Sequence, residues 1–383
     1  MLAATARVTR DLDVAEECVQ DAYVAALATW ARDGVPDSPG AWLTVAARRN
    51  ALNVLQRART LQSKLPLLLE PEAEEMPEDE TIPDDRLRLV FVCCHPALSR
   101  EAQVALTLRL VCGVATPDIA DAFLLSEPTM AARLTRAKKK IAAARIPYTV
   151  PDAAELPGRI DAVLTVIHLL ATTGHTAPRG ERLLREDLLE RALDLARMLV
   201  ALLPSEPEAR GLLALVLVLH ARRETRGELL ADQDRSAWDR AAIAEADGLV
   251  RSALAEGPAG RFTLQAAIAA LHAQAPSWEE TDWPQIVTLY GELLRVWPSP
   301  VVALNRAIAV SMADGPRVAL PEIEALERDG RLAGYRYLPA AKADMLRRLG
   351  RNDEAADAYR AALALAENAA ERGFLERRLR ELA

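Results

Sequence analysis

Residues 116–140 read TPDIADAFLLSEPTMAARLTRAKKK, and this stretch predicts two helices joined by a tight turn. Thr116 and Ser126 are residue types that cap helix N-termini, and Pro117 suits the first position of a helix. The turn between the helices is expected at residues 124–125. Small and apolar residues fall where a helix-turn-helix needs buried contacts, at Ile119, Ala120, Phe123, Leu125 and Met130.

The second of these helices carries a basic face. Its cationic residues are Arg133, Arg136, Lys138, Lys139 and Lys140, and no acidic residue occurs between positions 131 and 145. An uncompensated basic face attracts phosphates, and arginine can bind a guanine edge with two hydrogen bonds, so the pattern indicates DNA binding. The alternative is an ordinary helical hairpin with a solvated basic face, which the caps and the spacing together make less favoured.

The composition favours helix throughout the chain. It has 383 residues, of which 51% are hydrophobic and only 4% are aromatic. Alanine and leucine dominate and runs of β-branched residues are scarce, so we expect an all-α protein of two or three domains. The formal net charge of −8 argues against a protein that coats nucleic acid, so the positive charge that binds DNA has to be local.

Two helices of opposite charge are expected near the N-terminus. The acidic segment at 11–30 has one apolar stripe, made of Val14, Cys18, Val19, Ala22 and Ala26. Its other face carries Glu16, Glu17, Gln20 and Asp21. Glycine and proline within residues 31–40 end this helix, and a basic helix is expected at 39–59. Its apolar residues at helical spacing are Trp42, Leu43, Val45, Ala46, Leu52 and Leu55, of which Trp42 is expected in the core.

An acidic stretch broken by prolines separates this part from the helix-turn-helix. Residues 70–85 read EPEAEEMPEDETIPDD, which cannot bury enough apolar surface to order itself, so we expect a linker there. Apolar helices are expected at 87–94 and 101–111. After Pro151, long amphipathic segments rich in Ala and Leu alternate with Pro and Gly, which predicts stacked helical hairpins. Degenerate spacing of the kind found in tetratricopeptide repeats occurs at Ala192, Ala196, Leu199 and Pro204, at Tyr290, Leu293 and Pro298, and at Ala355, Tyr359 and Ala362.

Three stretches of the chain together resemble bacterial sigma factors of the sigma-70 family. Residues 14–22 (VAEECVQDA) are similar to the second conserved region, residues 41–52 to the promoter-melting segment that follows it, and residues 119–137 to the helix-turn-helix of the fourth region. Their order along the chain is stronger evidence than any one motif. The extracytoplasmic-function (ECF) group is the most similar. Residues 91–98 (FVCCHPAL) and 232–239 (DQDRSAWD) further resemble its subgroup with a tetratricopeptide-like C-terminal extension.

The resemblance implies a domain organisation and a function. Region 2 is implied at residues 1–65, the acidic linker at 66–86, region 4 at 87–150 and the helical-repeat extension at 151–383. The implied protein directs RNA polymerase to promoters and is not itself an enzyme. Region 2 is then expected to bind core polymerase and the −10 element, and region 4 the −35 element. The chain begins almost inside the first helix expected of region 2, which leaves open whether the natural start lies upstream.

The resemblance also assigns site residues. The implied polymerase contacts are Glu16, Glu17, Gln20 and Asp21, although a charge run by itself is more often a solvated face. The implied −10 contacts are Arg48, Arg49, Asn50, Asn53 and Arg57, since phosphates and a flipped base need donors. The implied −35 contacts are Ser126, Thr129, Ala132, Arg133, Arg136, Lys138, Lys139 and Lys140. Asn53 and Gln56 stand where such factors more often have Asp and Arg, and Leu124 stands at a turn position often held by Gly. Altered contact with the melted DNA and a reshaped turn are therefore expected.

No metal or cofactor is expected. Cys93, Cys94 and His95 lack a second ligand pair at zinc-site spacing, so packing is expected for them, with reduced thiols in the cytoplasm. Residues 232–239 show no acid/base pair, so a buried turn or salt-bridge network is expected there. The longest apolar stretch, at 211–220, is too short to span a bilayer, and no signal peptide is evident. A cytoplasmic protein is therefore expected.

The alternative function is a helix-turn-helix transcriptional regulator whose helical repeats sense a ligand or a partner. Such a regulator has no need of an acidic helix at 11–30 followed by a basic helix at 39–59, so the first part of the chain favours the sigma factor. A repeat scaffold or an enzyme leaves the basic helix of the helix-turn-helix unexplained. For the repeats we expect either a protein partner or contact with the chain's own sigma domains.

Overall fold

A computed structural model describes residues 1–63, 85–123, 125–149, 151, 155–175, 184–225 and 230–382. These residues form helices and turns, with no β-strand among them, so the all-α prediction is confirmed. Leu124 and the expected linker at 66–86 lie outside the described residues, apart from the last two positions of the linker. The chain divides into two compact units, Met1–Val166 and Ile167–Ala383.

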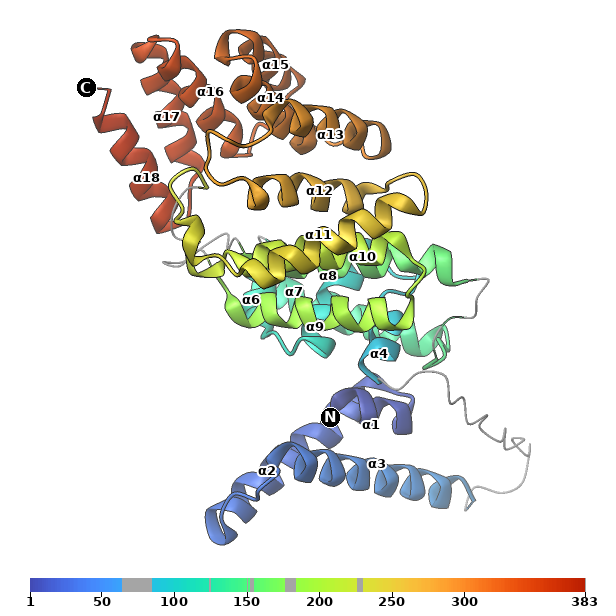
Figure 1. Ribbon diagram of the computed structural model, residues 1–383. Coiled ribbons are helices and arrows are strands. Elements are labelled where there is room, and N and C mark those ends of the chain that lie inside the picture. Colours follow the sequence, from blue (N-terminus) through green and yellow to red (C-terminus); the bar gives the residue numbers. More distant parts are fainter. Residues whose placement is uncertain are drawn as a thin grey trace. The chain divides into compact units, whose positions relative to one another are not determined.

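The first unit contains the helices expected near the N-terminus and around the helix-turn-helix (Figure 1). They are α1 (Leu2–Thr9), α2 (Leu12–Asp33), α3 (Pro39–Ser63), α4 (Asp85–Cys93), α5 (Arg100–Leu106), α6 (Thr116–Ala122), α7 (Glu127–Ala143) and the front part of α8 (Leu156–His175). A π-helical turn, η1 (Thr107–Val111), continues α5, so the helix expected at 101–111 changes its winding partway along.

α2 and α3 pack along each other around the apolar stripe that the sequence predicts. Trp30 and Trp42 contribute to this core with ring centroids 5.5 Å apart, so the core role expected of Trp42 is confirmed. The buried members of the core are Val19, Ala22, Ala26, Leu43 and Ala47. Val45 and Leu52 are exposed instead, because the buried stripe of α3 follows the four-residue spacing of positions 43, 47 and 51.

Local chemistry accounts for both ends of α2. The Asp11 carboxylate accepts hydrogen bonds from the backbone N–H groups of Asp13 and Val14, which have no partner inside the helix. At the other end Gly34 has a φ of 83°, a conformation that glycine adopts without steric cost. The helix breaker expected between residues 31 and 40 is therefore present.

α6 and α7 form the predicted helix-turn-helix, and α7 also packs against α5. Ile119, Ala120 and Met130 are buried as predicted, whereas Phe123 and Leu125 are only half-buried. The backbone N–H of Leu125 donates to the carbonyl oxygen of Ala120 at 2.9 Å, which ties the turn to α6. The motif is thus held together by the contacts that its sequence spacing requires.

The cysteines of the first unit are buried side chains. Cys94 Sγ lies 3.8 Å from the Thr107 hydroxyl, and burial raises the pKa of the Cys94 thiol to about 12, so the thiol stays protonated at neutral pH. The packing role expected of Cys93 and Cys94 is confirmed. Among the described residues, no three His, Cys, Asp or Glu side chains gather where they could hold a metal ion.

The front half of α8 belongs to the first unit. The Arg159 guanidinium donates a hydrogen bond to the carbonyl oxygen of Phe91 on α4, and Arg100 at the start of α5 forms an ion pair with Asp161 at 3.4 Å. The first unit therefore extends to Val166, past residue 150, where region 4 is expected to end.

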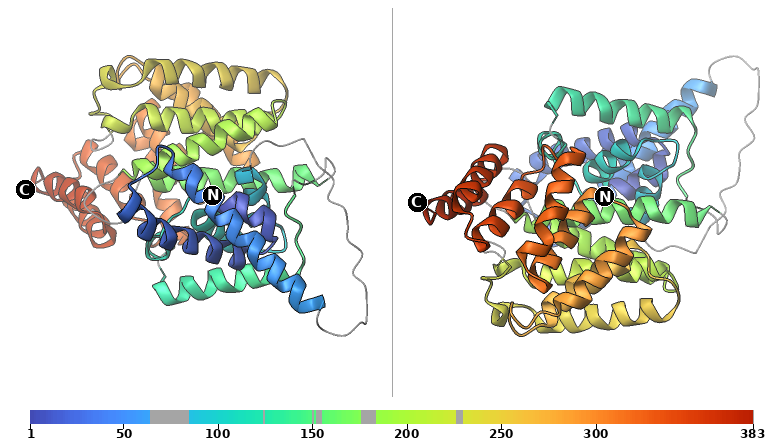
Figure 2. Two further views of the ribbon diagram at one scale, coloured as in Figure 1. Left: turned by 90° about the horizontal axis from the view of Figure 1, so that it is seen from below. Right: turned by 90° about the horizontal axis from the view of Figure 1, so that it is seen from above.

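The second unit is a series of helices that pack against one another in chain order, which agrees with the expected hairpins (Figures 1 and 2). They are the rest of α8, α9 (Glu186–Leu202), α10 (Pro207–Ala221), α11 (Arg240–Ala255), α12 (Arg261–Gln274), α13 (Trp283–Val296), α14 (Pro300–Ala313), α15 (Pro316–Asp329), α16 (Tyr337–Arg348), α17 (Asn352–Leu365) and α18 (Ala369–Arg380). Two short 3-10 turns, η2 (Arg223–Thr225) and η3 (Arg235–Ala237), connect α10 to α11.

Residues 232–239 form a turn, as the sequence predicts, but only the side chains of Gln233, Arg235 and Trp238 are buried in it, and its three aspartates are exposed. The side chains of Asp234 and Asp239 cap η3 and α11, respectively. The buried Arg235 guanidinium lies against the ring of Trp238 and donates to the carbonyl oxygens of His272 and Ala275, both at 2.7 Å. A cation at these carbonyls also complements the helix dipole at the C-terminal end of α12. The role of this motif inside the unit is therefore structural.

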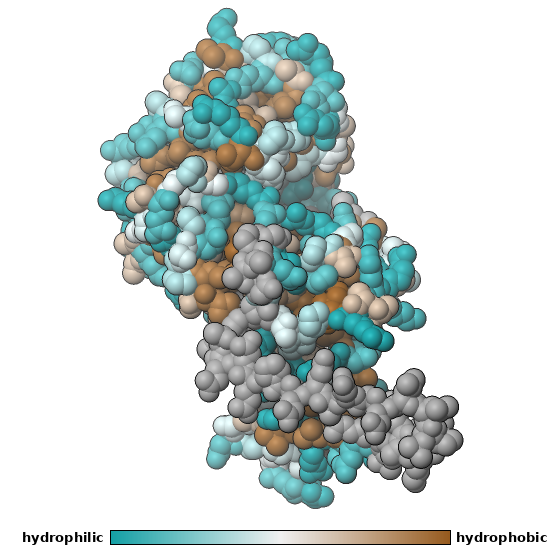
Figure 3. Space-filling model, turned by 90° about the vertical axis from the view of Figure 1, so that its right-hand side faces the viewer, coloured by the Kyte–Doolittle hydropathy of each residue, from teal (hydrophilic) through white to brown (hydrophobic). Residues whose placement is uncertain are grey.

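The surface is mixed in character. On the face drawn in Figure 3, hydrophobic residues form small areas between hydrophilic ones. No helix in the described part of the chain is both long enough and apolar enough to cross a membrane.

Candidate nucleic-acid interface

α7 buries one face and exposes another. Its buried residues, Met130, Leu134, Ala137 and Ile141, repeat at the spacing of one helix face. Of the residues expected to contact the −35 element, those exposed are Ser126, Thr129, Ala132, Arg136, Lys139 and Lys140, and those half-buried are Arg133 and Lys138. The structure thus brings the predicted residues onto one helix, most of them open to solvent.

The N-terminal end of α7 differs in detail from the expected cap. Ser126 is the N-cap residue, but its hydroxyl lies 2.8 Å from the Thr129 hydroxyl and makes no hydrogen bond with the helix backbone. The Arg133 guanidinium lies over the ring of Phe123, 5.9 Å from its centroid, and this cation–π contact joins the basic face of α7 to the end of α6. Arg136 Nε donates to the Ala132 carbonyl oxygen at 3.3 Å.

Lys138 points away from solvent, toward α2. Its Nζ lies 2.5 Å from Asp13 Oδ1 and 2.7 Å from Glu16 Oε2, and its side chain is only 16% exposed. Burial lowers the pKa of Lys138, but the hydrogen bonds that its ammonium group donates to Asp13 and Glu16 outweigh burial and raise that pKa above its usual value. The expectation of an uncompensated basic face is therefore wrong at Lys138, because carboxylates far away in the sequence neutralise it.

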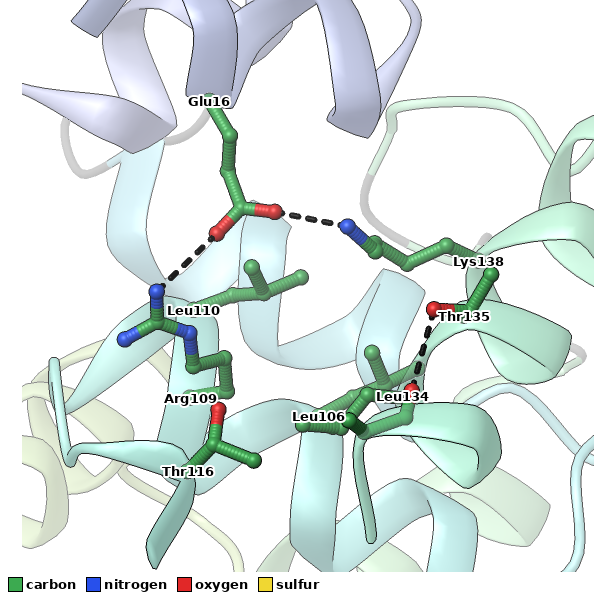
Figure 4. Close-up of a pocket in the computed structure, with 9 residues that line it drawn as sticks. Glu16, Leu106, Arg109, Leu110, Thr116, Leu134, Thr135 and Lys138 are labelled. Carbon is green, nitrogen blue, oxygen red and sulfur yellow. Dashed lines mark hydrogen bonds and ion pairs between the residues drawn. The ribbon is translucent and has the colours of Figure 1, made fainter. Parts of the chain in front are cut away.

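Glu16 also forms an ion pair with a second cation, across a pocket that both cations line. Figure 4 shows its carboxylate between Lys138 and Arg109, with Arg109 Nη2 at 3.8 Å from Glu16 Oε1. The pocket has a volume of about 200 Å³, and its polar lining includes Thr116 and Thr135. Glu16, expected to bind polymerase, is therefore engaged inside the chain in this structure.

A mixed acidic and apolar surface lies on α2, which we call the α2 face. It consists of Glu17, Gln20, Asp21, Val24 and Leu27, which share one side of the helix by their spacing. Val24 is 66% exposed, Leu27 is 76% exposed, and Tyr23 beside them is 47% exposed. These three residues were not predicted from the sequence, although their position off the buried stripe was a signal for their exposure. Exposed apolar side chains with a polar rim are typical of interaction sites.

α3 presents a basic and apolar surface. Arg48, Arg49, Asn53 and Arg57, all expected at the −10 element, are exposed. Asn50 is half-buried, and its side-chain amide donates to the Cys18 carbonyl oxygen at 3.3 Å, which ties α3 to α2.

Comparison with known proteins gives matches over most of the chain. The model for sigma-70 region 2 matches residues 2–60, the model for sigma-70, region 4 matches residues 88–141, and a family of unknown function (DUF6596) matches residues 159–254. The uncharacterized protein R00370 of Rhizobium meliloti (strain 1021) is 42% identical over 396 residues, which cover 100% of this chain and 93% of the relative. No solved structure matches the chain.

The matches and the geometry agree. α2 and α3 lie within the region 2 match, and α6 and α7 lie within the region 4 match, apart from the ends of α3 and α7. Sigma factors bind core RNA polymerase and promoter DNA, and they have no enzymatic activity of their own. The chain is therefore a sigma factor of the sigma-70 family, with regions 2 and 4 followed by a DUF6596 domain, and it belongs to the same family as R00370.

Proposed function

We propose that this sigma factor is of the ECF group and that α7 reads the −35 element in the major groove. The observation that supports this proposal most strongly is the basic face of α7. This helix is the second helix of a helix-turn-helix, and its basic face lies opposite its buried stripe. Arg133 lies in the N-terminal half of α7, the part of a recognition helix that usually contacts base edges, and Arg136 follows one turn later near the middle of the helix. Lys139 and Lys140 supply charge for phosphates.

Region 2 is proposed to have two surfaces. The α2 face docks on the clamp helices of the polymerase's largest subunit, where Val24 and Leu27 provide apolar contact area and Glu17 and Asp21 provide charge. The basic surface of α3, with Arg48, Arg49 and Arg57, contacts the −10 element as it opens. The polymerase, with its own magnesium, carries out the chemistry in the cytoplasm.

A conventional regulator with a helix-turn-helix is the second candidate. Its helix-turn-helix binds an operator without polymerase, and nothing in it requires the α2 face. The region 2 match at residues 2–60 supports the sigma factor over this alternative. In vitro transcription with bacterial core polymerase on a genomic promoter library tests the choice, since only a sigma factor starts specific transcripts in the absence of any other sigma.

Arg133→Ala and Arg136→Ala are each expected to weaken holoenzyme binding to its promoter by about 1–3 kcal/mol if the lost contact is bidentate to a base. Electrophoretic mobility shifts on promoter DNA and on duplexes with altered −35 elements measure the effect. Arg251→Ala on α11, which removes an exposed arginine elsewhere, is the control. An equal loss on every DNA sequence would identify phosphate contacts and contradict base reading.

The second unit is proposed to be a tetratricopeptide-like domain that regulates the sigma regions or recruits a partner.

Truncation of the chain after His175 tests this proposal. It keeps Arg159 and Asp161, which are tied to α4 and α5, whereas a cut at residue 150 removes them. Run-off transcription with the 1–175 chain is expected to differ from that with the full-length protein by about fivefold or more, which is the low end of typical coupling between sites. Equal transcription and equal promoter binding by full-length and shortened protein would show that the unit only stabilises the chain.

A further inference from the structure

We propose that Arg145 forms, together with Lys139 and Lys140, a phosphate-binding patch at the C-terminal end of α7. The partner that fits this patch is the DNA backbone that flanks the −35 element. The inference deepens the proposed function and rests on it, because it concerns the far end of the helix proposed to read that element. Arg145 is not among the residues that the sequence resemblance assigns to DNA.

The free positive charge of α7 is concentrated in this patch. Lys139, Lys140 and Arg145 are exposed, and none of them has a hydrogen-bond or ion-pair partner among the described residues. No acidic residue occurs between positions 128 and 151, so no neighbour in the sequence neutralises them. The cations that precede the patch on α7 each have a contact within the chain, and they are Arg133, Arg136 and Lys138. A phosphate therefore meets uncompensated charge at the C-terminal end of the helix.

Arg145 has a backbone conformation that favours glycine. Its φ is 48°, and it follows α7 in a Schellman motif. The N–H of Ile146 donates to the carbonyl oxygen of Ile141 at 3.2 Å, and the N–H of Arg145 donates to that of Ala142 at 3.1 Å. A side chain at this position introduces steric strain, which corresponds to about a five- to thirtyfold change in the folding equilibrium. The chain thus keeps an arginine where glycine fits with less strain, and such an outlier indicates a functional role.

A purely structural role does not account for this arginine. Cations near a helix C-terminus are favoured by the helix dipole, but Lys139 and Lys140 already supply that charge on regular helical backbone. Arg10, the other non-glycine residue with positive φ in the described part of the chain, is also exposed and has a φ of 52°. Asp11 and Asp13 follow it closely in the sequence. Arg145 differs from Arg10 in that it adds its charge to an uncompensated basic patch.

The length of α7 brings the patch to the DNA backbone. α7 has 17 residues and is therefore about 26 Å long. The major groove is only about 12 Å wide. When the N-terminal half of α7 contacts base edges, its C-terminal end extends beyond the groove to the flanking phosphates. The C-terminal end of the recognition helix of homeodomains contacts the backbone in the same way.

The experiment compares three full-length variants bound to bacterial core polymerase. Arg145→Gly removes the charge and the strain, Arg145→Lys keeps both, and Arg10→Gly makes the same change as the first variant at the matched position outside α7. Fluorescence anisotropy measures holoenzyme binding to a promoter duplex and to the same duplex with a scrambled −35 element, between about 50 and 200 mM salt.

We expect Arg145→Gly to weaken binding by about three- to tenfold at about 0.1 M salt, by the same factor on both duplexes. The slope of log K against log salt concentration is expected to become shallower by about one, because one phosphate contact is lost. Arg145→Lys is expected to keep the wild-type slope, since an ammonium group also neutralises a phosphate. Arg10→Gly is expected to change neither the affinity nor the slope.

Urea unfolding of the same variants shows whether the arginine serves the fold instead. We expect neither glycine variant to unfold at a lower urea concentration than the wild type, because relief of the left-handed strain outweighs the added freedom of the unfolded chain. A lower urea midpoint in Arg145→Gly alone would assign Arg145 to the fold and overturn the proposal.

An unchanged salt slope in Arg145→Gly, or an equal change in Arg10→Gly, would also overturn the patch. The proposed function fails on a different result, which is that Arg133→Ala and Arg136→Ala leave promoter binding unaltered. The salt dependence on the scrambled duplex still decides in that case whether Arg145 contacts a phosphate, because this contact needs no base sequence. The two hypotheses are therefore separable.

Discussion

Leu27→Asp is expected to weaken the complex with core polymerase by about 3 kcal/mol or more, which corresponds to more than about a hundredfold in Kd. Leu27 is 76% exposed in the free protein, so its loss costs the fold little. Buried in an interface, a leucine contributes about 1.5–3 kcal/mol, and an aspartate in its place adds the cost of desolvating a charge. The acidic neighbours are expected to contribute less, because exposed charges are screened by salt.

Fluorescence anisotropy with labelled sigma factor and unlabelled core polymerase measures this effect. Leu254→Asp on α11 makes the same change at a leucine that is 43% exposed, and it controls for solubility and folding. Combined charge reversal at Glu17 and Asp21 tests the acidic part of the α2 face. Unchanged affinity in both the Leu27 variant and the double variant would exclude this face as the docking surface.

Gly211→Ala is expected to destabilise the second unit by about 3 kcal/mol, although alanine is the better helix former. Gly211 lies on α10 against α12, where an added Cβ would be 2.6 Å from the backbone N and 2.7 Å from Cα of Thr263. Backbone atoms of a packed helix cannot move aside at small cost, so the two helices would have to separate. Gly248 on α11 is the matched control, since nothing lies within 4 Å of its added Cβ.

Urea unfolding of the full-length variants, monitored by circular dichroism, distinguishes the effects of the two substitutions on the free energy of unfolding. Gly248→Ala is expected to raise the free energy of unfolding by about 0.5–1 kcal/mol, because alanine removes conformational freedom from the unfolded chain. Equal stabilisation by both substitutions would contradict the close approach of α10 and α12.

The sequence by itself determined the helices and the identity of the sigma regions. The periodic stripes of α2 and α7, the helix breakers around Gly34 and the spacing of Ile119, Ala120 and Met130 all depend on residues a few positions apart. Local backbone geometry converts such spacing into a helix face, so these features can be predicted without the rest of the chain. The order of the motifs then identified regions 2 and 4.

Only the tertiary structure determines which of these side chains are paired within the chain and which helices pack closely against each other. Lys138 and Glu16 are 122 positions apart, and neither local pattern contains information about the other. Gly211 and Gly248 are both helical glycines in sequence, and only the packing of α12 distinguishes them. The partners of Arg235 likewise depend on which helices meet. The physical reason is that helix periodicity is set by near neighbours, whereas packing and charge pairing are set by the approach of distant segments.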